Sequence, residues 1–265
     1  MNLPLIGLGT FRLEGQQAIA SVSAALDIGY RLIDTAQMYN NETEVGRAIA
    51  GSAVPRSEVF VTTKIWPDNF ARLIPSLQQS LARLKMEQVE LTLLHWPAPD
   101  SGIPLADTLG ALIEAQARGL TLHIGVSNFN IEMMRQAIAI AGADKISTNQ
   151  IELSPYLQNR RVADFARSQR IRITSYMTLA RGQVLGDQTL GQVAKRHGAT
   201  TAQVALAWAM RLGHTVIPSS TQPGNLQGNF ESLRLNLTEE DMAQIAQLDR
   251  GQRLIDPAGL KPQWD

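Results

Sequence analysis

Three short apolar segments of the chain each end in an ionisable residue. The segment RLID ends in Asp34, VFVTTK ends in Lys64 and VELTLLH ends in His95, while Tyr39 follows in the loop after Asp34. If these segments are consecutive strands of a parallel barrel, their ends lie side by side on one rim and the four side chains share one apolar mouth. Buried charge is costly unless it is paired, so we expect Asp34 and Lys64 to form an ion pair.

This set of side chains suits the protonation of a carbonyl oxygen. A phenol titrates near about 10, so Tyr39 holds a proton at neutral pH that it can donate. The Lys64 ammonium stabilises the phenolate, which we expect to lower the pKa of Tyr39, and Asp34 keeps Lys64 charged and in place. Neutral His95 can orient the carbonyl oxygen. Lys64 also suits Schiff-base formation, as in aldolases, and each residue taken alone has an ordinary structural explanation.

The other strand ends carry amides, hydroxyls and an aromatic ring. The fifth segment ends in GVSNF with Ser127 and Asn128, the sixth in NQIE with Gln150, the seventh in Tyr176, and the eighth in IPSST with Ser219, Ser220 and Thr221. Such groups would hold a flat ligand with hydrogen-bonding edges, and Tyr176 could stack on its ring. Pro223 and Gly224 open a helix whose N–H groups favour an anion. The alternative is that these residues only form turns and helix caps.

A regular alternation of strands and helices must position these groups. Apolar or β-branched segments begin near Leu5, Arg31, Val59, Val89, Thr121, Ile146, Ile171 and Thr215. Between them, apolar residues spaced three and four apart predict helices, as at Leu77, Leu81 and Leu84. Thr238 with Asp241 predicts a capping box at the start of the last helix.

The alternation predicts an α/β fold with a parallel sheet. Eight such units in 265 residues predict a (β/α)8 TIM barrel, with residues 1–265 as a single domain. A doubly wound open sheet is the second candidate. Its dinucleotide fingerprint fails, because Arg12 stands where the third glycine is needed.

The composition limits the class of protein and its partners. Hydrophobic residues make up 44% and charged residues 18%, which excludes a disordered chain. The 24 basic and 24 acidic residues give a net charge of zero, so we expect no nucleic-acid partner. Apolar runs reach about seven residues against roughly twenty for a membrane span, and we expect no membrane partner. With no cysteine and no signal-peptide core, the sequence predicts a cytoplasmic protein, with a monomer as the default.

Metal catalysis has little support in the sequence. The four histidines, His95, His123, His197 and His214, lie far apart, and neither an HxxxH pair nor a carboxylate cluster is present. We therefore expect no metal ligands.

In this order, the motifs resemble those of the aldo-keto reductase superfamily. The resemblance rests on DTA with Tyr39, TTK with Lys64, HWP with His95, GVSNF, NQIE and IPSS, and it runs from Gly7 to about Leu248. Within the superfamily, NQIELSPYLQNR and ITSYMTLARG are most similar to the bacterial 2,5-diketo-D-gluconic acid reductases of the B type.

The resemblance implies an eight-stranded barrel that reduces aldehydes or ketones with NADPH. It implies Tyr39 as proton donor, Lys64 and Asp34 as the pair that tunes it, and His95 as the residue that orients the carbonyl. It further implies that Ser127, Asn128 and Gln150 bind the nicotinamide carboxamide, that Tyr176 stacks on the ring, and that Leu179 belongs to a loop over the pyrophosphate. The reaction itself would be a hydride transfer supplied by the cofactor.

The chain departs from the superfamily pattern at the cofactor phosphate. Ser219 and Asn225 stand where many members carry a Lys and an Arg on the 2′-phosphate of NADPH, and Gly228 replaces a common adenine-binding Glu beside Asn229. Each lost charge-assisted hydrogen bond is worth about 1.5–3 kcal/mol. We expect NADPH to remain preferred over NADH through Ser219, Ser220, Thr221 and the helix N-terminus, but to bind weakly.

The chain also departs from the superfamily pattern at the carbonyl pocket. Phe11 replaces a tryptophan usual after GLGT, and Trp66 and Trp96 are further candidate walls, although Trp96 is equally explained by barrel packing. The segment 98–104 is short and little chain follows Leu248, so we expect a shallow, open pocket for small or polar carbonyls. Keto-sugar acids, α-keto aldehydes and β-keto esters fit this description. Besides the aldolase, an NADPH-binding regulatory or structural barrel without turnover remains an alternative.

Overall fold

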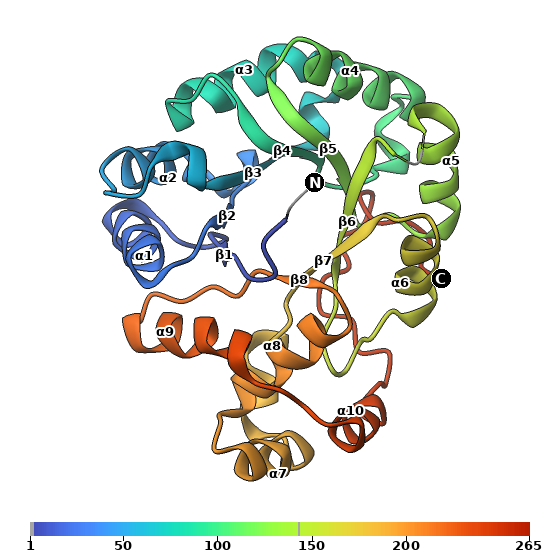
Figure 1. Cartoon of the computed structure of the whole chain (residues 1–265). Helices are drawn as coiled ribbons and strands as arrows, with labels where there is room; N and C mark the ends of the chain where they lie inside the picture. The colour runs from blue at the N-terminus through green and yellow to red at the C-terminus, as the bar shows by residue number, and fades with distance from the viewer. Residues whose placement is uncertain (1–2, 143) are drawn as a thin grey trace.

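The computed structural model describes residues 3–142 and 144–265, which form a ring of strands inside a ring of helices (Figure 1). All eight strands are parallel and follow one another in chain order. They are β1 (Leu8–Gly9), β2 (Leu32–Asp34), β3 (Phe60–Ile65), β4 (Val89–Leu94), β5 (Thr121–Ser127), β6 (Ile146–Glu152), β7 (Arg172–Tyr176) and β8 (Thr215–Val216). Every strand predicted from the sequence is present.

Helices connect the strands and cover the outside of the sheet. The α-helices are α1 (Gly15–Ile28), α2 (Glu42–Ala50), α3 (Leu73–Leu84), α4 (Leu105–Ala117), α5 (Ile131–Ala141), α6 (Arg160–Ser168), α7 (Gln188–His197), α8 (Thr201–Arg211), α9 (Pro223–Glu231) and α10 (Glu239–Ala246). The shorter 3-10 segments are η1 (Gln37–Tyr39), η2 (Arg56–Glu58), η3 (Pro67–Arg72), η4 (Pro99–Ser101), η5 (Ala180–Gly186) and η6 (Ser232–Arg234). Within the described part of the chain, none of the helices is long and apolar enough to cross a bilayer.

The first and last strands meet and close the sheet into a barrel. Ile6 and Val216 form a parallel bridge, and the Gly7 N–H donates to the Val216 carbonyl at 2.8 Å. The closure explains a glycine of the GLGT motif, because a Cβ on Gly9 would lie 2.6 Å from the carbonyl oxygen of Ile217. The (β/α)8 barrel is therefore confirmed, and the open doubly wound sheet is excluded.

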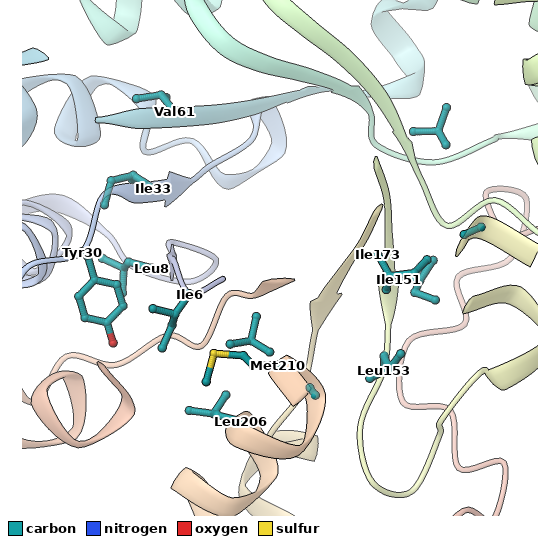
Figure 2. Packing of buried hydrophobic residues seen from close by; sticks show 14 of the residues in the cluster. Ile6, Leu8, Tyr30, Ile33, Val61, Ile151, Leu153, Ile173, Leu206 and Met210 are labelled. Atoms are coloured by element: carbon teal, nitrogen blue, oxygen red, sulfur yellow. The ribbon is translucent and has the colours of Figure 1, made fainter. Parts of the chain in front are cut away.

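Apolar side chains between the strands and the helices form the core. Figure 2 shows Ile33 and Val61, which are paired residues of β2 and β3, on the same side of the sheet. On the helix side, the predicted face of α3 at Leu77, Leu81 and Leu84 is buried. Because the apolar side chains of the strands and of the helices are buried against one another, the helices hold the strands in place around the barrel.

The start of α10 has the capping box that the sequence predicted. The Asp241 N–H donates to the Thr238 hydroxyl at 3.1 Å, and the Thr238 N–H donates to the Asp241 carboxylate at 2.8 Å. Two N–H groups that have no partner within the helix are satisfied in this way.

Burial of His214, next to β8, makes the stability of the fold sensitive to acid. Its side chain is buried, and burial, followed by the charge of Arg167 and opposed by Asp164, lowers its pKa from 6.5 to about 4. The unfolded chain therefore binds a proton at a higher pH than the folded chain, so the free energy of unfolding falls as the pH drops from 6.5 toward 4.

We expect the variant His214→Gln to lose this part of the pH dependence. Between about pH 7 and pH 5, the wild type should lose about 2 kcal/mol more of its unfolding free energy than the variant. Urea unfolding of both proteins at the two pH values measures the difference, and the other histidines cancel because both proteins carry them. Equal losses in the two proteins would contradict the assignment.

Candidate active site

Four ionisable side chains from three neighbouring strand ends meet at one end of the barrel. Asp34 ends β2, Lys64 lies in β3, and His95 directly follows β4, while Tyr39 ends η1. The Lys64 Nζ donates to Asp34 Oδ1 and, at 2.9 Å, to the carbonyl oxygen of Thr35. It also lies 3.2 Å from the Tyr39 hydroxyl. The predicted ion pair is present, and the phenol and the amine are within hydrogen-bond distance.

The hydrogen bonds of Lys64 determine the direction of the Tyr39 proton. An ammonium carries three donors and no acceptor, and here the three donors reach Asp34, the Thr35 carbonyl and Tyr39. The Tyr39 oxygen therefore accepts from Lys64. The proton of the phenol itself must point away from Lys64, where it can be given to another acceptor.

Burial and charge act in opposite directions on this pair. Burial lowers the pKa of Lys64, but the charges of Asp34 and Tyr39 outweigh it and the net pKa is raised, so the amine stays charged. Burial raises the pKa of Tyr39, and Lys64 lowers it by less, so the net shift is upward. The expectation of a lowered pKa for Tyr39 is therefore wrong in sign, because removal from water disfavours the phenolate more than Lys64 stabilises it.

His95 is neutral in this site. Burial, followed by the charge of Lys64, lowers its pKa well below the usual value. Its Nδ1 is buried and has no hydrogen-bond partner among residues 3–142 and 144–265. A neutral imidazole has one N–H, and placing it on Nε2 avoids a buried unpaired donor at Nδ1. The ring can then donate one hydrogen bond from Nε2.

Aromatic rings line the mouth next to these groups. The Phe11 ring centroid lies 5.1 Å from that of Tyr39, and the Trp66 ring meets the His95 ring edge-on at 5.3 Å. Both Phe11 and Trp66 are half-buried, so part of each ring is accessible to a ligand. Trp96 is 5% exposed and presents little surface to a ligand, so its position agrees better with packing.

Two amide side chains that the sequence did not single out, the buried Asn41 and the half-buried Gln37, hold these walls. Asn41 donates from Nδ2 to the carbonyls of Thr10 and Leu13, each at 2.8 Å, and joins the loop of Phe11 to the loop after β2. Gln37 accepts the Trp66 N–H at 3.0 Å and joins the Trp66 loop to η1. Both residues connect segments distant in sequence, and no spacing or motif indicated them.

A second network contains the amide and hydroxyl residues of the following strands. Gln150 Nε2 donates to Asp34 Oδ2 at 2.7 Å, and the Ser127 hydroxyl donates to the backbone carbonyl of Gln150 at 2.8 Å. Asn128 Nδ2 donates to the His95 carbonyl at 3.0 Å and to the Ser127 hydroxyl at 3.1 Å. The Tyr176 hydroxyl donates to Asn128 Oδ1 at 2.6 Å. The two groups of residues, identified separately in the sequence, thus form one connected network through Asp34.

The remaining candidate residues lie farther along the same rim. Leu179 immediately precedes η5, Ser219, Ser220 and Thr221 follow β8, and Asn225 and Asn229 lie on α9. Ser219 and Asn225 are exposed, whereas Asn229 is buried. Within the described ranges, no hydrogen bond joins these residues to the Tyr39 network.

The loop after β7 holds three residues other than glycine in the left-handed backbone region. Met177 has φ 55°, Ala180 has φ 46° and Arg181 has φ 53°. Side chains with a Cβ are disfavoured there, and such strain gathers at ligand clamps and switch regions. The loop that contains Leu179 is therefore held in a strained backbone conformation.

The amide network fits one edge of a nicotinamide. The side-chain amide of Gln150 donates an N–H to Asp34. Its side-chain oxygen, Oε1, is left as an acceptor for an N–H of a carboxamide ligand. Across residues 3–142 and 144–265, no group of three His, Asp or Glu side chains is arranged to hold a metal ion.

Comparisons with known proteins identify the family of the chain. The model of the Aldo/keto reductase family matches residues 5–250. The chain is 54% identical to a methylglyoxal reductase DkgB of Yersinia pestis and 53% identical to one of Escherichia coli O157:H7, in each case over all of both chains. A crystal structure provisionally named a 2,5-diketo-D-gluconic acid reductase B matches with a TM-score of 0.96 and 42% identity, covering 100% of this chain and 94% of its own. This chain is a member of the aldo/keto reductase family.

Proposed function

We propose that the protein reduces small aldehydes or ketones with NADPH and that Tyr39 donates the proton. The observation that carries the proposal is the 3.2 Å contact between the Tyr39 hydroxyl and the Lys64 ammonium, beside neutral His95. Because Lys64 donates to the Tyr39 oxygen, the phenol proton is free to be given to another acceptor, with a fixed cation beside it. The family membership supports the same reaction.

The bound cofactor would supply the hydride, and the chain's own residues would hold its nicotinamide end. In this proposal Ser127, Asn128 and Gln150 bind the carboxamide, and Tyr176 packs on the ring. The strained loop at Leu179 covers the pyrophosphate. Ser219, Ser220, Thr221, Asn225 and Asn229 contact the adenosine and its phosphate. The side-chain oxygen of Gln150, an acceptor, is the structural feature that fits an amide ligand.

The protein residues would control one proton. His95 donates from Nε2 to the carbonyl oxygen and places it near the Tyr39 hydroxyl. As negative charge develops on that oxygen, Tyr39 gives up its proton, and the fixed Lys64 ammonium stabilises the phenolate. Asp34 keeps Lys64 charged and in place, and a later proton from water restores the phenol.

The hydrogen bonds of Lys64 disfavour the aldolase alternative. A Schiff-base lysine must be an uncharged amine that can reach the substrate carbonyl. Lys64 instead has a raised pKa and directs its donors to three protein acceptors. The regulatory barrel has no specific observation in its favour, because all four acid–base residues are present and in contact. That the enzyme works as a cytosolic monomer stays a prediction of the sequence.

The variant Tyr39→Phe tests the role of the phenol. Without the donated proton, kcat for carbonyl reduction should fall by about 10²- to 10⁴-fold, while the dissociation constant of NADPH stays near that of the wild type. The decrease in NADPH absorbance measures the rate. Tyr30→Phe is the matched control, because its hydroxyl bonds the Leu226 carbonyl at 2.9 Å, away from Lys64. A Tyr39→Phe enzyme that kept a tenth of its activity would refute the assignment.

The choice of cofactor can be tested at the exposed position Asn225. We expect the wild type to have a higher kcat/KM with NADPH than with NADH, through Ser219, Ser220 and Thr221. Asn225→Arg supplies one charge-assisted hydrogen bond worth about 1.5–3 kcal/mol, so the KM for NADPH should fall by about tenfold or more. The KM for NADH, which lacks the 2′-phosphate, is the internal control. A wild-type preference for NADH would overturn the proposal.

The relatives of the chain suggest the size of the substrate. The similar proteins are named for methylglyoxal and 2,5-diketo-D-gluconic acid, and the Phe11 and Trp66 rings lie beside Tyr39 and His95. We expect kcat/KM to be higher for methylglyoxal, 2,5-diketo-D-gluconate and a β-keto ester than for a steroid ketone. Steady-state rates over this panel test the expectation, and a strong preference for the steroid would contradict it.

A further inference from the structure

The end of the chain forms a strap, residues 250–265, that lies along the rim of the barrel. The N–H groups of Arg250 and Gln252 donate to the Tyr156 carbonyl at 3.2 and 3.0 Å, so the strap begins at the loop after β6. Farther along, the Gln263 carbonyl accepts a hydrogen bond from the side chain of Asn130 at 2.8 Å, at the start of α5. Figure 1 shows this red end of the chain beside α5 and α6.

The strap lies beside two of the loops that carry site residues. Near its end, the Leu260 carbonyl accepts the Ala98 N–H at 3.1 Å, three residues after His95. Its contact at Asn130 lies two residues after Asn128. The strap therefore runs past the loops that carry the proposed carbonyl and nicotinamide contacts, although little chain follows Leu248.

A buried carboxylate at the end of β6 holds the strap. Glu152 is 1% exposed, and its Oε1 accepts the Leu254 N–H at 2.7 Å while its Oε2 accepts the Ile255 N–H at 2.9 Å. Hydrogen bonds to an ionised acceptor are about twice as strong as neutral ones. The strap contacts at α5 are solvent-exposed, so water competes for their donors and acceptors. Glu152 is thus the principal attachment of the strap to the barrel.

The strap in turn stabilises the charge of Glu152. Burial raises the pKa of this carboxylate, and the two strap N–H groups, followed by the charges of Arg253 and Arg181, oppose that shift. The Arg253 guanidinium is held within the strap by stacking on the Trp264 ring at 3.5 Å. The strap supplies two N–H donors and a cation that stabilise the charged carboxylate. The carboxylate in turn holds the strap through the same hydrogen bonds.

We propose that Glu152 is a positioning residue that holds the C-terminal strap against the mouth of the carbonyl site. The attachment itself follows from the hydrogen bonds, and its consequence for substrate rests on the proposed function. A held strap narrows the mouth beside His95 and Asn128, so it contributes to the retention of a small substrate. It touches none of the groups that transfer the proton, so it should affect KM rather than kcat.

The variant Glu152→Gln tests this role. It keeps the shape but replaces one acceptor by an N–H that faces a strap N–H, and it removes the charge. Amide exchange at Leu254 and Ile255 should quicken, and trypsin should cleave after Arg253 in the folded protein. The KM for methylglyoxal should rise about fivefold or more with kcat within about twofold. Glu152→Asp, which keeps the charge with a shorter reach, should fall between the two.

Glu90→Gln is the matched control. Glu90 also accepts a backbone N–H, that of Val61 at 2.7 Å, and pairs with Arg56, but it makes no contact with the strap. This variant should leave the strap protected and KM unchanged.

A variant on the strap side resolves the case in which Glu152→Gln does not fold. Ile255→Pro removes one donor to Glu152 without altering β6, and Ala258→Pro is its control within the strap. Release of the strap with a raised KM supports the proposal in either variant. A folded variant with a protected strap, or a released strap with unchanged KM, overturns it. If the wild type reduces no carbonyl compound, the proposed function fails, while exchange and proteolysis still decide the attachment.

Discussion

The burial of one ammonium group determines how the rest of the site is built. Lys64 is 0% exposed, and an unpaired charge at that depth would cost several kcal/mol, so the neighbouring atoms must neutralise and satisfy it. Asp34 provides the charge, and its second oxygen is held by Gln150 from the other side of the barrel. The site therefore exists only when β2, β3 and β6 are all in place. The barrel and its chemistry are specified together.

The features that the sequence predicted correctly share one physical cause. An ionisable or amide side chain at the end of an apolar strand is expensive to bury, so its presence at Asp34, Lys64, His95 and Gln150 already indicates a partner nearby. The strands themselves are predictable because both faces are covered, which requires almost continuous apolar runs. Alternation with helices then leaves a closed barrel as the arrangement that places all those ends together.

What the sequence did not predict depends on distances between loops. Asn41, Gln37 and Glu152 act by joining backbone groups of other segments, and nothing in their local sequence specifies the partner. The net pKa shift of Tyr39 has the same origin, because its sign is a balance between the depth of burial and the distance to Lys64. The strap was missed because length alone does not reveal where a short segment lies.

The short pairing between β1 and β8 affects where the barrel opens in thermal fluctuations. These strands have two residues each, whereas β6 and β7 pair over five positions, so thermal opening of the cylinder should begin at this pairing. The loops that leave the two strands carry Phe11 on one side and Ser219 on the other. A ligand that contacts both loops would bridge the β1–β8 pairing, which is the weakest part of the sheet. Its binding free energy would therefore add to the stability of the closed barrel.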